Sequence, residues 1–148
     1  MIIIPLLAIE GSKTRDVTAN DIRYQIWNPC ITQICNDAGC VCVGGYENHT
    51  GSSTVKGVVQ ASSNKVFVNG QKVAKLNDSV KETEQTHIPS NAVNISNHTS
   101  GTGKIIVGNS NRVYVEGVLA AIVGSQVKTH TSPSTVIETG CKNVYVGS

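Results

Sequence analysis

Two stretches of this 148-residue chain repeat each other without a gap, and this repeat limits the possible folds more than any other feature. Residues 63–81 (SNKVFVNGQKVAKLNDSVK) and 110–128 (SNRVYVEGVLAAIVGSQVK) are identical at 8 of 19 positions. A third, shorter copy, KNVYVG, occupies residues 142–147. Units this small do not bury their apolar faces alone, so the three copies predict packing around a shared axis.

Each copy predicts a β-hairpin. In the V-[FY]-V pattern the two valines face one side of a strand and the aromatic residue faces the other. Asn69-Gly70 and Glu116-Gly117 follow as turn residues, and Asn-Gly is a strong hairpin signal. We expect three related hairpins, centred on residues 66–73, 113–121 and 144–146, with further short strands at residues 21–27, 57–60 and 104–107.

The composition supports an all-β fold. The chain has 20 Val, 14 Ile and 13 Thr but only four Leu, and β-branched residues favour strands over helices. Its net charge is +2 and its aromatic content 4%, without the basic stripe and stacking aromatics of a nucleic-acid-binding protein. We therefore expect short antiparallel strands, almost no helix and no nucleic-acid partner.

The N-terminal segment is apolar from residue 2 to residue 9 and is interrupted by Pro5. It is too short to cross a bilayer, and it has neither a preceding basic residue nor a small-residue cleavage site directly after it. We expect a buried strand here and no signal peptide. We divide the chain into an N-terminal extension, residues 1–45, and a repeat domain, residues 46–148.

Three of the four histidines precede the repeats in a common H-T-[GS] motif. His49, His98 and His130 lie 17, 15 and 14 residues before the first valine of their copy. If the repeats surround an axis, the three imidazoles converge at one end of the molecule. A tetrahedral zinc ion takes four N or S ligands, which leaves one position for a Cys or for the fourth histidine, His87.

The five cysteines do not predict a disulfide framework, because their number is odd and no secretory signal is present. Four of them, Cys30, Cys35, Cys40 and Cys42, follow the spacing C-x4-C-x4-C-x-C. This spacing differs from the paired C-x2-C motifs of a zinc ribbon.

The repeats resemble the PAAR-repeat family, whose members cap the spikes of contractile phage tails, type VI secretion systems and related injection machines. The unit G-S-x-[NK]-V-[FY]-[VI]-N-G-x-x-[VA]-A-x-x-x-D of that family is followed closely by residues 61–78. The second copy, residues 108–125, has Ser125 in place of the Asp, and the third stops after V-Y-V-G-S, as is common in the family. The resemblance covers roughly residues 46–148.

The resemblance implies a cone of three β-hairpin repeats with a flat apolar base and one structural zinc or iron ion near the vertex. Carried over to this chain, it implies His49, His98 and His130 as metal ligands. Cys42, seven residues before His49, resembles the family's Cys before His, with Cys40 or His87 as alternatives for the fourth ligand. We expect Cys141 to be a packing residue.

The function that the resemblance implies is structural. The chain would be a single tip protein seated on a trimeric β-helical spike, made in the bacterial cytoplasm and carried at the tip of a virion tail or injection particle. There it would contact the target cell envelope transiently and aid membrane piercing, with residues 1–45 as a possible adaptor to the spike. We expect no enzyme activity; the alternatives are a small zinc-dependent hydrolase and a β-rich carbohydrate-binding module.

Overall fold

The computed structural model describes residues 4–96 and 100–147. This part of the chain is all-β and contains no helix, as the composition predicts. The strands are β1 (Val17–Asn36), β2 (Gly39–Gln60), β3 (Phe67–Val68), β4 (Gln71–Lys72), β5 (Ser79–His87), β6 (Val93–Ser96), β7 (Gly101–Ile105), β8 (Tyr114–Val115), β9 (Val118–Leu119), β10 (Gln126–Lys128) and β11 (Ser134–Val136).

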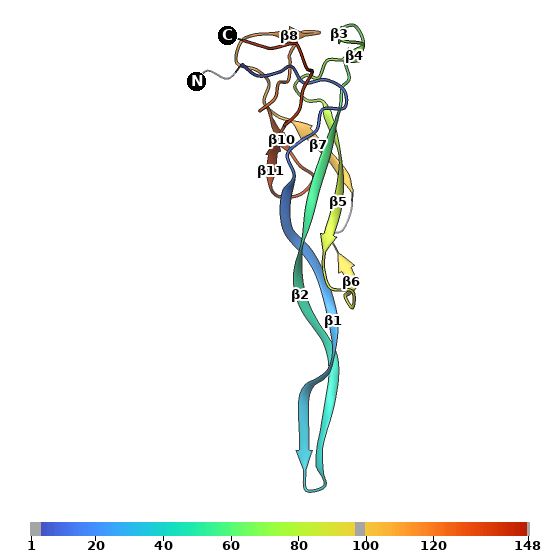
Figure 1. Cartoon of the computed structure of the whole chain (residues 1–148). Helices are drawn as coiled ribbons and strands as arrows, with labels where there is room; N and C mark the ends of the chain where they lie inside the picture. The colour runs from blue at the N-terminus through green and yellow to red at the C-terminus, as the bar shows by residue number, and fades with distance from the viewer. Residues whose placement is uncertain (1–3, 97–99, 148) are drawn as a thin grey trace.

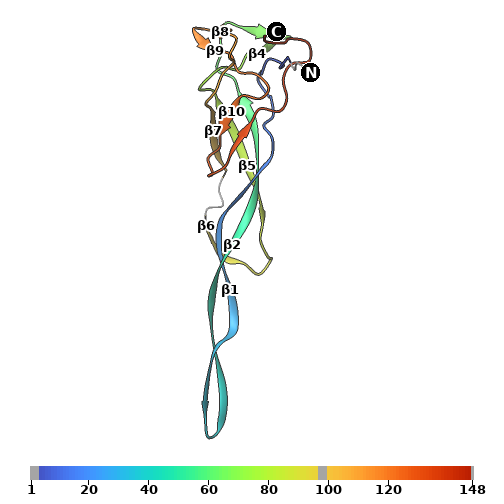
Figure 2. The same ribbon diagram turned by 90° about the vertical axis from the view of Figure 1, so that its left-hand side faces the viewer.

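The molecule is elongated, with a broad end and a narrow end (Figures 1 and 2). The broad end carries the short strands β3, β4, β8 and β9 together with both ends of the chain. Below it lies a seven-stranded antiparallel sheet in the order β11-β10-β7-β5-β2-β1-β6. The narrow end is the far half of the β1–β2 hairpin, which projects well beyond the other strands.

The long β1–β2 hairpin loses its neighbouring strands part of the way along its length. On one side, β5 pairs with β2 from Gln60 down to Ser52 and ends there. On the other side, β6 pairs with β1 only at Arg23 and Gln25. Among the residues described, nothing else continues the sheet, and we name residues 26–46 the distal hairpin. The expected domain boundary after residue 45 falls inside β2.

The first two repeats form the expected hairpins. Strand β3 pairs with β4, and β8 pairs with β9. Both turns have two central residues with positive φ, 52° and 78° at Asn69-Gly70 and 52° and 79° at Glu116-Gly117. Two positive φ angles in succession define the turn type that matches the twist of a hairpin, and this explains the Gly at the second position.

The third repeat has no return strand of its own, and the N-terminal segment takes that place. Tyr145 pairs with Leu6 in an antiparallel bridge. The N–H of Leu7 donates to the carbonyl of Val144 at 2.9 Å, and the N–H of Cys141 donates to the carbonyl of Leu7 at 2.9 Å. The equivalent bond in the second repeat joins the N–H of Ala120 to the carbonyl of Val113 at 2.9 Å. The chain therefore builds three similar lobes, the third from its two ends.

The three lobes meet in a closed cycle of backbone hydrogen bonds, which we name the alanine ring. The N–H of Ala8 donates to the carbonyl of Ala121 at 3.0 Å, Ala121 to Ala74 at 2.9 Å, and Ala74 to Ala8 at 3.0 Å. All three alanines are fully buried, at 0% exposure. Their methyl groups belong to a core that also contains the buried aliphatic residues Val59, Val80, Ile105, Val127 and Ile137.

A second feature repeats in each lobe, four residues after the ring alanine. The side chains of Ser12, Asp78 and Ser125 each accept a hydrogen bond from the N–H three residues earlier, at 3.0, 2.9 and 3.0 Å. The residue just before each of them has a positive φ, 85° at Gly11, 75° at Asn77 and 99° at Gly124. The same local turn thus follows the ring in all three lobes, which gives the broad end an approximate three-fold symmetry.

The close packing of the alanine ring predicts that none of its three positions accepts a larger side chain. In Ala121→Leu the added carbons have no space in the close-packed ring, so we expect the free energy of unfolding to fall by about 1–3 kcal/mol or more. Urea unfolding followed by circular dichroism measures this loss. The matched control is Ala38→Leu in the exposed turn between β1 and β2, which we expect to change stability by less than about 0.5 kcal/mol. Equal stability of the two variants would contradict the packing described here.

Candidate functional site

The broad end presents three equivalent aromatic side chains to solvent. Phe67, Tyr114 and Tyr145 occupy the same position in the three repeats and are 52%, 59% and 58% exposed. The following valine of each repeat, Val68, Val115 or Val146, faces the other way and packs in the core layer below. The second valine of each V-[FY]-V unit thus holds its lobe to the core and the aromatic ring faces solvent, whereas the first valines of the first two repeats, Val66 and Val113, are 37% and 39% exposed.

Contacts between the lobes hold this surface in place. The Glu116 carboxylate, in the turn of the second lobe, accepts hydrogen bonds from the N–H groups of Asn64 and Lys65 in the first lobe, at 2.8 and 3.0 Å. The hydrogen bond from Asn64, followed by that from Lys65 and the charge of Lys75, lowers the pKa of Glu116. In the first lobe the side chain of Asn69 donates to Asn143 of the third lobe at 2.7 Å.

The lowered pKa of Glu116 predicts a pH-dependent contribution to stability. A carboxyl whose pKa is lower in the folded state stabilises the fold above its ordinary value of 4.5, and this contribution is lost as the pH falls through the folded pKa. We expect Glu116→Gln to be less stable than the natural chain at pH 7 and the difference to shrink toward pH 3, as measured by urea unfolding. Glu138→Gln, at another exposed carboxylate, serves as the control. A difference that stays constant with pH would contradict this role.

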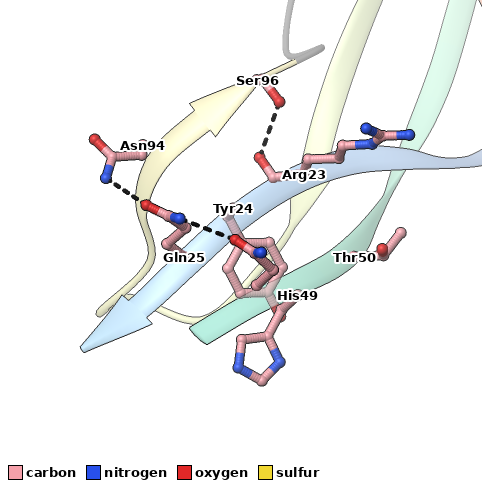
Figure 3. A pocket seen from close by; sticks show the side chains of 8 residues that line it. Arg23, Tyr24, Gln25, His49, Thr50, Asn94 and Ser96 are labelled. Atoms are coloured by element: carbon pink, nitrogen blue, oxygen red, sulfur yellow. Dashed lines mark hydrogen bonds between the residues drawn. The ribbon is translucent and has the colours of Figure 1, made fainter. Parts of the chain in front are cut away.

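His49 lies on β2 within the long hairpin, where it stacks on Tyr24 of β1. The ring centroids are 5.5 Å apart and the planes differ by 16°. A polar groove surrounds this pair, in which Asn94 donates to Gln25 and Gln25 donates to Asn48, at 2.8 and 2.9 Å (Figure 3). His87, on β5, bonds through Nε2 to the Thr54 hydroxyl at 2.8 Å. His98 lies outside the described residues.

His130 lies between two buried carboxylates of β5. Its Nδ1 is 2.8 Å from Glu82 Oε1 and its Nε2 is 2.8 Å from Glu84 Oε1, while its backbone N–H donates to Glu82 Oε1 at 2.7 Å. The Glu82 and Glu84 side chains are 0% and 2% exposed. Because the two carboxylates face opposite edges of the ring, the three groups bind one another and do not converge on a common point. Gly101 and Gly103 leave space for this cluster, since a Cβ at either would meet His130 or Glu82.

This cluster predicts a large loss of stability when the histidine is removed. In His130→Ala the two carboxylates remain buried without the ring between them, so we expect the free energy of unfolding to fall by about 3–5 kcal/mol. The comparison is His49→Ala, which removes an exposed ring and one stacking contact worth about 1 kcal/mol. Thermal or urea unfolding of the two variants at pH 7 measures the difference. A His130→Ala variant as stable as His49→Ala would show that the cluster does not support the fold.

The four clustered cysteines form two disulfides, Cys30–Cys42 and Cys35–Cys40, so the prediction of no disulfide framework is wrong. An odd number of cysteines does not exclude disulfides here, because four of them pair and the fifth, Cys141, is a buried free thiol. Both bonds join β1 to β2, and the pairing of these strands places Cys35 directly opposite Cys40. Cys141 is free and buried, as predicted, and its thiol donates to the carbonyl of Val144 at 3.2 Å.

The described residues do not assemble the predicted metal ligands. Cys42 Sγ is bonded to Cys30, His49 stacks on Tyr24, and His130 lies between two glutamates. Cys42 and His49 are seven residues apart on the same extended strand, roughly 23 Å at about 3.3 Å per residue. No group of three His, Cys, Asp or Glu side chains within residues 4–96 and 100–147 is arranged to hold a metal ion. Cys42, His49 and His130 thus do not share one site in this structure, and the ion implied by the family resemblance stays a prediction for elemental analysis.

No protein-family model matches the chain, and a search of curated proteins finds no significant match. Within the described residues no helix is present that is long and apolar enough to cross a membrane.

Proposed function

We propose that this chain is a spike-tip protein of the PAAR-repeat type, which caps a trimeric β-helical spike of a contractile phage tail or related injection machine. The broad end is the docking surface, and the narrow end points away from the spike. A single copy sits on three spike chains. The role is structural, and no step of it requires enzyme activity.

The observation that carries this proposal is the three-fold repetition of exposed aromatic residues on one chain. A partner with three-fold symmetry presents three identical surfaces around its axis, and a single chain matches all of them only if it repeats its own surface three times. Phe67, Tyr114 and Tyr145 are repeated in this way, and their lobes are linked by the alanine ring. Exposed aromatic residues gathered at one end of a small protein are typical of a binding surface.

The end of a β-helical spike also needs a cover. Its last turn presents unpaired N–H and C=O groups that invite pairing with other chains. The short strands β3, β4, β8 and β9 and the C-terminal segment lie at the broad end and offer backbone groups near the aromatic rings. Docking of this end would bury apolar side chains of the tip and cover the open edges of the spike in one interface.

The proposal predicts a complex with one tip chain for three spike chains. The probe is the purified trimeric spike protein of the particle in which the chain occurs, and the measurement is size-exclusion chromatography with light scattering. In a variant with Phe67, Tyr114 and Tyr145 replaced by Ser, we expect the affinity to fall at least about a hundredfold, because central aromatic residues dominate interface energies.

The matched control is Tyr46→Ser, which removes an equally exposed aromatic ring from the opposite end and is expected to leave the affinity unchanged. A natural chain that forms a stable homotrimer and ignores the spike would contradict the proposal. So would a triple variant that binds as tightly as the natural chain.

A further inference from the structure

The distal hairpin, residues 26–46, displays large apolar side chains that nothing in the described structure covers. The exposed fractions range from 43% to 65% for the six residues Trp27, Ile31, Ile34, Val41, Val43 and Tyr46. Both outer edges of the hairpin are also open, because β5 and β6 end before it begins. A strand pair of this kind is normally protected by charged side chains on its edges.

The two faces of the distal hairpin are both apolar but differ in kind. Ile34 lies opposite Val41, and Val43 follows two residues later, so these three share one face. Ile31 joins this aliphatic face, since its side chain lies over Gly45. The other face carries the two disulfides and the pair Trp27–Tyr46, whose ring centroids are 5.1 Å apart.

Charge is nearly absent from this segment. Between Arg23 and Glu47 the chain contains one ionisable acidic or basic residue, Asp37, in the turn at the tip. A partner that recognises the segment by ion pairs is therefore disfavoured. A partner protein that docks on one face would also leave the other apolar face in water.

The distal hairpin is stabilised by covalent bonds between its strands and not by a hydrophobic core. A two-stranded hairpin alone is marginally stable in water. Here two disulfides connect the strands beyond the point where the other described strands end. Gly44 leaves room for the Trp27 ring, which a Cβ at that position would meet at 2.5 Å. The two strands that carry the apolar side chains are thus covalently joined to each other.

We propose that the distal hairpin binds the interfacial region of a phospholipid bilayer. The aliphatic face lies toward the acyl chains, and Trp27 and Tyr46 lie at the headgroups, the level that these two residue types favour in membrane proteins. The open edges of the two strands exclude a position across the bilayer, because their peptide groups need water. A hairpin lying in the interface keeps its edges hydrated and buries its aliphatic face.

This inference rests on the proposed function in one respect, namely that the narrow end is the part of the particle that meets the target envelope. Its test does not need the spike. Trp27 is the single tryptophan of the chain, so its fluorescence reports on the hairpin directly. The experiment uses the full oxidised chain and vesicles of phosphatidylcholine, with flotation as a second readout. We expect a blue shift of the emission and binding that hardly changes between low and high salt, because the hairpin is nearly uncharged.

The test variant is Ile34→Ser with Val41→Ser, which leaves Trp27 in place. We expect at least about tenfold weaker partition into vesicles, because two side chains of the aliphatic face are lost. The matched control is Ile106→Ser with Val107→Ser, the same chemical change at residues of the body that are 42% and 45% exposed. Reduction of the disulfides is expected to weaken partition as well, and circular dichroism checks that the body stays folded.

The inference is overturned if the natural chain does not bind vesicles, if the Ile34/Val41 variant binds equally well, or if the control loses as much. It is also overturned if Trp27 is shifted without vesicles through association of two copies. The aromatic triple variant of the broad end separates the two proposals, since it is expected to lose the spike and keep the vesicles.

Discussion

The fold depends on the close approach of three backbone segments at the alanine ring. Each ring residue gives its N–H to one neighbouring segment and its carbonyl to the other, so no segment is an edge. Segments this close leave room for no side chain larger than a methyl group. This explains why the three ring positions are alanines, Ala8, Ala74 and Ala121, all at 0% exposure. The hairpins are attached to this cycle, and the valine after each aromatic residue, Val68, Val115 or Val146, packs in the layer beside it while the aromatic residue faces outward.

Completion of the third lobe requires both ends of the chain. The third copy of the repeat stops after its first strand, and the N-terminal segment supplies the strand that is missing. Two incomplete pieces thus make one complete lobe, and a single chain acquires approximate three-fold symmetry. The aromatic positions of the three lobes become equivalent in their surroundings for the same reason.

The parts of the fold that the sequence predicts correctly are local. The V-[FY]-V pattern and the turn residues Asn69-Gly70 lie within one hairpin, so neighbouring residues are sufficient to predict it. The third lobe joins residues near 7 to residues near 144. A signal for it was present, because residues 6–12 (LLAIEGS) match residues 119–125 (LAAIVGS) at 5 of 7 positions. The predicted metal site assumed that equal spacing before each repeat means convergence in space. His49 instead lies on the extended strand β2, where each residue adds about 3.3 Å, so residues several positions apart, such as Cys42 and His49, are far apart in space.

The two ends of the molecule are stabilised by different interactions. At the broad end, the alanine ring and buried aliphatic side chains hold the lobes together. Reduction is expected to leave them unaffected, because Cys141 is already a free thiol. At the narrow end, no described strand pairs with the two strands of the distal hairpin from outside, and they are joined by Cys30–Cys42 and Cys35–Cys40. Oxidation therefore acts on the distal hairpin alone. A chain made under reducing conditions would complete its broad end first and acquire the two disulfides of the distal hairpin only after it reaches an oxidising environment.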